Sequence, residues 1–149
     1  MAVVEIRDDD VLIVVDVQND FLPGGTLAVP NGDEVIGPVN RLGCAFRHVV
    51  LTQDWHPAGH ISFASSHPGK TAFDRIVLPY GEQVLWPDHC VQGTPGADLA
   101  ATLDLPHAEL IIRKGYNPAV DSYSGFTEAD HRSTTGLEGY LREIGRAHV

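Results

Sequence analysis

Carboxylate and imidazole side chains gather around the segment that follows residues 47–52, a short apolar run rich in β-branched residues and typical of a buried strand. Asp54 and His56 come just after this run, and side chains two residues apart on an extended chain point the same way. Asp oxygen and His nitrogen both suit zinc, iron or manganese, so the pair predicts two corners of a divalent-metal site. His60 is a candidate third ligand from the same loop, and His89 is a candidate from a distant loop. A solvated surface turn is the alternative interpretation.

A second pair of charged residues follows two other expected strands. Residues 11–15 form a continuous apolar run, as in a strand buried on both faces, and the run ends on Asp16. A carboxylate at the mouth of a buried strand is well placed to take up a proton. A turn-forming Asp that caps backbone N–H groups is the alternative. Lys114 follows an expected strand at 108–112 and would lie near Asp16 if the two strands share a sheet, although a solvated strand-end cation is also consistent with its position.

The alternation of strand and helix signals predicts a parallel sheet built from βαβ units. Asp33 is the candidate N-cap of the first helix, and Gly145 is the candidate residue that ends the last one. The elements expected are strands at 11–15, 48–52, 108–112 and 147–149 and helices at 35–46, 94–103 and 137–144.

Residues 57–93 show little helical or strand periodicity, and a structureless excursion of this length in a compact domain is usually functional. Within it, Trp86 is a candidate for stacking on a flat ligand, with an ordinary packed Trp as the alternative. Phe21 either walls a small aromatic pocket or belongs to the core. Tyr123, in a later loop, is available to line a cleft.

Composition limits the class of protein. The chain has 149 residues, of which 43% are hydrophobic, enough for one globular domain with a core. A formal net charge of -10 argues against a nucleic-acid partner or an anionic membrane surface. There is no apolar run near the length of a membrane span, the acidic N-terminus does not resemble a signal peptide, and two cysteines do not make a disulfide framework. A cytoplasmic location is the default expectation.

Four segments together resemble the nicotinamidases (pyrazinamidases), a branch of the isochorismatase-like cysteine hydrolases. They are residues 15–21, 53–57, 86–97 and 113–126. The resemblance covers nearly the whole chain. It implies a three-layer α/β/α fold with a parallel, Rossmann-like sheet, of which this chain carries about the first half. It also implies hydrolysis of nicotinamide, and of pyrazinamide, to the acid and ammonia through a cysteine thioester.

The resemblance also implies roles for individual residues. Asp16 matches the general base that activates a cysteine thiol, and Lys114 matches the lysine that favours the thiolate. The matched metal ligands are Asp54, His56 and His89, with His60 similar to a further histidine at or near the metal. The matched walls around the pyridine ring are Phe21 and Trp86, and Tyr123 is expected to contact the substrate. The metal would be zinc, with iron or manganese as alternatives, and would take the ring nitrogen.

One part of the family's pattern is not matched. Its nucleophilic cysteine follows the fourth strand, and neither Cys44 nor Cys90 corresponds to it. We therefore expect residues 1–149 to be a single isochorismatase-like domain that is incomplete at its C-terminus. A missing C-terminal half or a homo-oligomer partner would complete it, and the first strand would expose an apolar edge without it. Two other functions stay open, namely another small-amide or isochorismatase-type hydrolase and a catalytically inactive metal-binding fragment.

Overall fold

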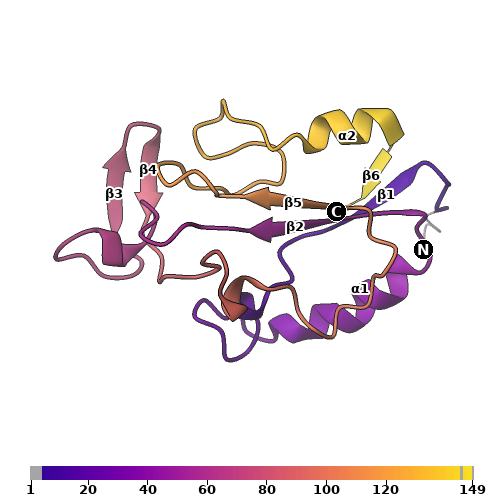
Figure 1. The fold of residues 1–149 in the computed structure, drawn as a ribbon, viewed down its shortest axis with the longest axis horizontal. Coiled ribbons are helices and arrows are strands. Elements are labelled where there is room, and N and C mark those ends of the chain that lie inside the picture. The colour runs from indigo at the N-terminus through magenta and orange to yellow at the C-terminus, as the bar shows by residue number, and fades with distance from the viewer. Residues whose placement is uncertain (1–4, 145, 149) are drawn as a thin grey trace.

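Four parallel strands form the centre of the molecule (Figure 1). Their spatial order is β5-β2-β1-β6. The computed structural model describes residues 5–144 and 146–148. The sheet consists of β1 (Asp10–Val14), β2 (His48–Asp54), β5 (Leu110–Lys114) and β6 (Arg146–His148). The helices are α1 (Ile36–Gly43) and α2 (Leu137–Ile144). The expected α/β fold with a parallel sheet is therefore confirmed.

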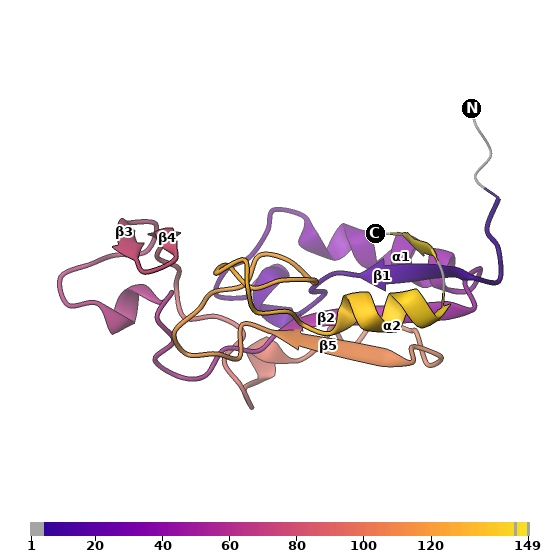
Figure 2. The same ribbon diagram turned by 90° about the horizontal axis from the view of Figure 1, so that it is seen from above.

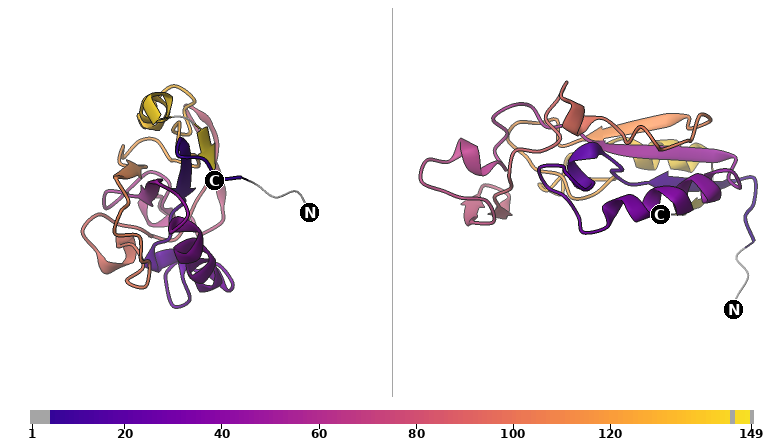
Figure 3. Two further views of the ribbon diagram at one scale, coloured as in Figure 1. Left: turned by 90° about the vertical axis from the view of Figure 1, so that its right-hand side faces the viewer. Right: turned by 90° about the horizontal axis from the view of Figure 1, so that it is seen from below.

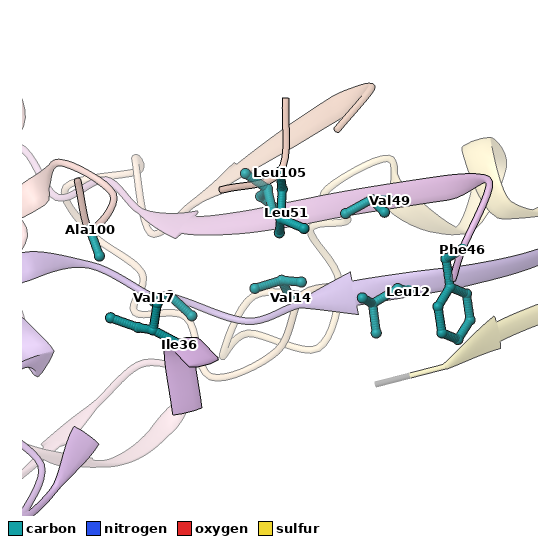
Figure 4. Packing of buried hydrophobic residues seen from close by; sticks show 9 residues of the cluster. All are labelled: Leu12, Val14, Val17, Ile36, Phe46, Val49, Leu51, Ala100 and Leu105. Atoms are coloured by element: carbon teal, nitrogen blue, oxygen red, sulfur yellow. The ribbon is translucent and has the colours of Figure 1, made fainter. Parts of the chain in front are cut away.

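The two helices cover opposite faces of this sheet, as the end-on view in Figure 3 shows. The reason is the two-residue period of a strand, which sends neighbouring side chains to opposite faces. In β1, Leu12 and Val14 join the cluster under α1, whereas Val11 and Ile13 join the cluster under α2. Figure 4 shows how the first cluster packs between β1, β2 and the start of α1. A strand buried on both faces reads as a continuous apolar run, and this is the run that residues 11–15 display.

The edge of β1 is covered where we expected it to be free. β6 pairs with β1 in parallel over Asp10 to Leu12, while β2 occupies the other side. The fourth strand is therefore confirmed, and the expectation of an exposed β1 edge is wrong over these three residues. Gly145 and Val149, which we had assigned to the end of the helix and to the strand, lie outside the described residues.

The excursion after β2 contains a hairpin that its sequence pattern did not indicate. β3 (Arg75–Leu78) pairs with β4 (Gly81–Val84) in antiparallel fashion, and the hairpin stands beyond the carboxyl ends of the sheet strands (Figure 2). Val77 is 85% exposed at a position where strand alternation would place a polar side chain. An apolar residue on the solvent face hides the period of two, so the prediction of a structureless excursion was wrong here.

Two further local predictions, the Asp33 cap and the helix at 94–103, were wrong. The segment before α1 is a 3-10 turn, Gly32–Val35, in which Asp33 is not the cap and no side-chain capping bond forms. The helix expected at 94–103 is only a 3-10 turn at Pro95–Ala97, because the following chain bonds to the extension of β1, with the Ala100 N–H donating to the Val17 carbonyl at 2.9 Å.

The third sheet strand is displaced by two residues from its expected position. β5 ends on Lys114, so that this lysine belongs to the strand itself rather than to the loop after it. Within the described part of the chain, no helix combines the length and apolar character needed to cross a membrane.

We expect Leu137→Ala to lower the free energy of unfolding by about 3 kcal/mol, because the side chain is fully buried between α2 and the sheet. Leu42→Ala is the matched control, since Leu42 is 49% exposed and should lose about 1 kcal/mol or less. Urea denaturation of both variants measures the difference. Equal losses would contradict the placement of α2 on the sheet.

Candidate active site

Three parallel strands end at one edge of the sheet and bring Asp16, Asp54 and Lys114 together. Asp54 and Lys114 are the last residues of β2 and β5 and are register partners, and Asp16 follows β1 by two residues. Lys114 Nζ lies 2.7 Å from Asp16 Oδ2 and donates a short hydrogen bond to Asp54 Oδ1. The expected proximity of Asp16 and Lys114 is therefore present, with Asp54 as a second carboxylate partner of the lysine.

Asp16 is held in an unusual backbone conformation. Its φ is 51°, in the left-handed region that non-glycine residues rarely occupy. Thr52 holds both the backbone and the side chain of Asp16. Its hydroxyl donates to Asp16 Oδ1 at 2.5 Å and accepts from the Asp16 N–H at 3.2 Å. Strain of this kind persists where surrounding contacts enforce it, and it is concentrated at functional sites.

Burial and mutual attraction set the charges of this trio. Burial raises the pKa of Asp16, and the neighbouring Lys114 offsets only part of that effect. Burial also opposes the charge of Lys114, but Asp54 and Asp16 together raise the pKa of Lys114 above its ordinary value. The trio thus holds a carboxylate with a raised pKa beside an ammonium that keeps its proton, which is the arrangement of a general base next to a fixed positive charge.

Asp54 also faces two histidines. Asp54, His56 and His89 are all buried, and each offers one ligand atom within 4.8 Å of the others. The Nδ1 positions of the two rings lie 2.9 Å from the Gly115 carbonyl and 2.8 Å from the Pro87 carbonyl, so Nδ1–H donates in both. The Nε2 atoms lie 3.7 and 3.8 Å from Asp54 Oδ2 and are the ring atoms left to bind a metal. Metal-binding histidines are oriented by such outer bonds, and the donor set fits a divalent ion.

The protonation states of His56 and Asp54 support the same interpretation, whereas burial lowers the pKa of His89 but its contact with Asp54 outweighs burial and raises it. Burial lowers the pKa of His56 to about 4, so this ring is neutral at pH 7. Burial works against the Asp54 charge, yet contacts with His89 and Lys114 lower the pKa of Asp54 to about 2. A neutral imidazole and an ionised carboxylate are the forms that bind metal.

His60 occupies a neighbouring position. Its ligand atom groups with those of His56 and Asp121 rather than with the first triad, and its ring lies 4.4 Å from that of His56, between centroids. Both of its nitrogens have partners, because Nδ1 accepts from the Ser62 N–H at 3.2 Å and Nε2 donates to the Asn117 carbonyl at 2.8 Å. A role for His60 as a metal ligand stays a prediction.

The charged trio and His89 line a common cavity of about 240 Å³, whereas His56 is not among its lining residues. All three aromatic residues proposed from the sequence line it, namely Phe21, Trp86 and Tyr123. Leu27 and the pair Asp121 and Ser122 line it too, and sequence reasoning missed them, because neither residue type nor spacing distinguishes them from other loop residues.

The hairpin supports one wall of this cavity. Trp86 Nε1 donates to the Tyr123 hydroxyl at 3.0 Å, and Gln83 Nε2, on β4, lies 2.7 Å from the same hydroxyl and 2.7 Å from Asp121 Oδ2. Gln83 is buried and was also missed. Its role depends on the hairpin, and the hairpin was not visible in the sequence pattern.

Gln18 supports the other side of the site. Its side-chain oxygen accepts from the Asp54 N–H at 2.7 Å, and its Nε2 donates to the Asp54 carbonyl at 2.9 Å. This fully buried amide therefore fixes the backbone that carries the shared carboxylate. A glutamine two residues after Asp16 was part of the sequence motif, but nothing in the sequence indicated its partner.

Comparisons with known proteins agree with this geometry. The model of the Isochorismatase domain matches residues 10–149. The chain belongs to this family. It is 63% identical over 134 residues to the nicotinamidase of Acinetobacter baylyi. The matched region covers 90% of this chain and 63% of that relative.

Solved structures of family members are similar as well. A nicotinamidase/pyrazinamidase from Acinetobacter baumanii superposes with a TM-score of 0.92 at 56% identity, over 95% of this chain and 69% of that one. The pyrazinamidase of Pyrococcus horikoshii in complex with zinc superposes with a TM-score of 0.68 at 37% identity, over 93% of this chain and 68% of that one. The chain spans about 63% of the length of the Acinetobacter baylyi relative.

Neither cysteine lines the cavity. Cys44 is exposed at the end of α1, and Cys90 is fully buried next to His89 in the chain. Burial raises the pKa of the Cys90 thiol well above its ordinary value, which suppresses the thiolate that a nucleophile needs. This agrees with the expectation that neither residue is the nucleophile of the family.

We expect Gly115→Ala to lower the affinity for zinc by at least about tenfold, because an added Cβ would overlap the imidazole ring of His56 and displace it from Asp54. Gly136→Ala is the matched control: both glycines have positive φ, 67° and 89°, but nothing lies within 4 Å of a Cβ at Gly136. Competition with a chromophoric chelator measures the affinity. The same loss in both variants would show that backbone strain, and not the imidazole overlap, is responsible.

Proposed function

We propose that this chain forms the metal-binding and substrate-binding part of a nicotinamidase that hydrolyses nicotinamide, and pyrazinamide, to the acid and ammonia. The observation that carries the proposal is the convergence of three features on one cavity. The charged trio, His89 and the aromatic walls all line the same cavity of about 240 Å³, and Asp54 and His89 form a triad with His56. The nicotinamidase relatives described above support the choice of substrate.

The bound metal in this proposal is zinc, held by Asp54, His56 and His89, with His60 at or near it. The pyrazinamidase of Pyrococcus horikoshii was crystallised with zinc, and the oxygen and nitrogen donors of the triad suit zinc, with iron and manganese as alternatives. When bound, the ion would act as a Lewis acid that holds the ring nitrogen of the substrate and orients its carboxamide.

The residues of this chain would act on the ring and on a proton. Phe21, Trp86 and Tyr123 line the cavity and would hold the pyridine ring between them. Asp16 would take the proton of a thiol, and the Lys114 ammonium beside it would stabilise the thiolate. The thiolate attacks the amide carbon and the C–N bond breaks. Ammonia leaves with the proton from Asp16, and water then hydrolyses the thioester.

The nucleophilic thiol lies outside residues 1–149 in this proposal. Its support is that neither Cys44 nor Cys90 lines the cavity and that the curated relative is longer than this chain. The thiol would come from a C-terminal part of the same domain or from a partner copy, and the assembled enzyme would work in the cytoplasm.

The positions of the cysteines also favour a second candidate function. Alone, this chain would bind the metal and the ring without hydrolysing the amide. The two functions differ in one measurable property, ammonia release by the chain on its own.

We expect His89→Ala to lower the affinity for zinc by on the order of 100-fold or more, because it removes a direct ligand whereas loss of an outer partner alone costs 10- to 100-fold. His67→Ala is the control, since His67 bonds to the Ile61 carbonyl at 2.7 Å and belongs to neither ligand group. His60→Ala should lose about tenfold, as expected of a neighbour that holds the loop. Chelator competition and metal analysis measure all three, and unchanged binding by His89→Ala would rule out the triad.

Activity is tested by joining residues 1–149 to the part of the Acinetobacter baylyi relative that they do not match. We expect this chimera to release ammonia from nicotinamide and the chain alone to release none. Asp16→Ala in the chimera should lower kcat by about 1000-fold, because the general base is lost. Asp9→Ala, which removes a carboxylate paired with Arg7 away from the cavity, should retain activity. Full turnover by Asp16→Ala would exclude the assigned base.

A further inference from the structure

Asp121 is a buried carboxylate without an ion-pair partner. Its side chain lines the 240 Å³ catalytic cavity, and the residue is 2% exposed. None of the ion pairs among the described residues includes it. A buried charge is strongly unfavourable on its own, and buried carboxylates are normally paired with a cation or bound to a metal. The position of Asp121 therefore requires a positive charge nearby.

The groups that bond to this carboxylate are all neutral. Gln83 Nε2 lies 2.7 Å from Oδ2, and the Ser122 N–H donates to Oδ1 at 2.9 Å. The Tyr123 hydroxyl bonds to the carboxylate as well. Such donors hold Asp121 in place beside the cavity, but they add no positive charge that would offset its own.

Two histidines beside Asp121 do not supply the charge either. A carboxylate oxygen of Asp121 lies within 4.8 Å of ligand atoms of His56 and His60. Burial lowers the pKa of His56 to about 4, so this ring is neutral at pH 7. Nδ1 of His60 accepts from a backbone N–H and its Nε2 donates to a carbonyl, so this ring carries one proton and is neutral too.

Two other groups on the cavity wall favour positive charge, but each has another carboxylate as its partner. The Lys114 ammonium contacts Asp16 and Asp54. Burial lowers the pKa of His89, but the contact with Asp54 outweighs burial and raises it. His89 must lose its proton to bind a metal, so the ion itself becomes the positive charge at this end of the cavity.

We propose that Asp121 is the charge partner of the divalent ion, so that its negative charge raises the affinity of the metal triad without a direct bond to the ion. The inference rests on the metal site of the proposed function. Asp121 does not group with Asp54 and His89 as a ligand, yet it shares a cavity with both. With the ion in place, two positive charges and Lys114 face the carboxylates of Asp16, Asp54 and Asp121, and the charges balance.

The test is the affinity of this chain for zinc, measured by competition with a chromophoric chelator. We expect Asp121→Asn to lower it by about tenfold, the effect of losing an outer partner of a metal site. Asp88→Asn is the matched control and should leave the affinity unchanged. It removes the same charge next to His89 in the chain, but Asp88 is exposed, and solvent and salt screen its charge.

Cobalt(II) in place of zinc separates charge from geometry. The visible absorption of bound cobalt depends on the ligands and on their arrangement around the ion. At saturating cobalt, Asp121→Asn should keep the spectrum of the unaltered chain, whereas His89→Ala should change it. A changed spectrum in Asp121→Asn would mean that Asp121 is a ligand or that its loss distorts the triad, and either result would overturn the proposal.

Two further variants separate charge from hydrogen bonding. Tyr123→Phe removes a hydroxyl that bonds to Asp121 and leaves the charge, so it should keep the zinc affinity. Asp121→Glu keeps the charge and should bind zinc more tightly than Asp121→Asn. An equal loss in Tyr123→Phe and Asp121→Asn would show that the bonded network, and not the charge, supports the metal site.

The outcomes distinguish this inference from the proposed function. If His89→Ala loses zinc but Asp121→Asn does not, the inference fails and the metal site stands. If neither variant loses zinc, the inference fails together with the metal site. If Asp121→Asn loses zinc with an unchanged cobalt spectrum but the chimera releases no ammonia, the inference stands and the proposed hydrolysis fails.

Discussion

The site depends on one buried ammonium shared by two carboxylates. Lys114, at the end of β5, contacts Asp54 at the end of β2 and Asp16 just after β1. Removing one partner of a buried ion pair leaves an uncompensated charge, which destabilises strongly. The parallel register of three strands is therefore tied to the chemistry, because a shift of one residue would turn Lys114 to the opposite face of the sheet.

Charge balance extends this constraint to the metal. Three carboxylates, those of Asp16, Asp54 and Asp121, line the catalytic cavity against the single ammonium of Lys114. Unbalanced buried charge is unfavourable, and a divalent cation beside Asp54 would offset the excess. Neutral His56, with Nε2 directed at Asp54, is prepared for that ion by the bond from its Nδ1–H to the Gly115 carbonyl. In the proposed function, the same sheet edge would support the proton chemistry and the metal site through one shared aspartate.

The loops beyond the sheet supply the recognition surface, and they do so through side-chain bonds that hold distant segments together. Gln83 joins the hairpin to Asp121 and Tyr123, and Gln18 joins the first loop to Asp54. Polar networks of this kind define a unique geometry when every member is satisfied.

The sequence by itself determined the parallel α/β class and a first strand buried on both faces, and it named the residues that we propose as the base, the lysine and the metal ligands. It could do so because a run buried on both faces is continuous, and because carboxylates and histidines after such runs fall at one edge of a parallel sheet. Only the tertiary structure decided the hairpin, since Val77 breaks its alternation, and the contacts of Gln18, Gln83, Asp121 and Glu128. Those roles arise from partners that are 13 to 40 residues away in the chain, and no local pattern encodes a partner at that distance.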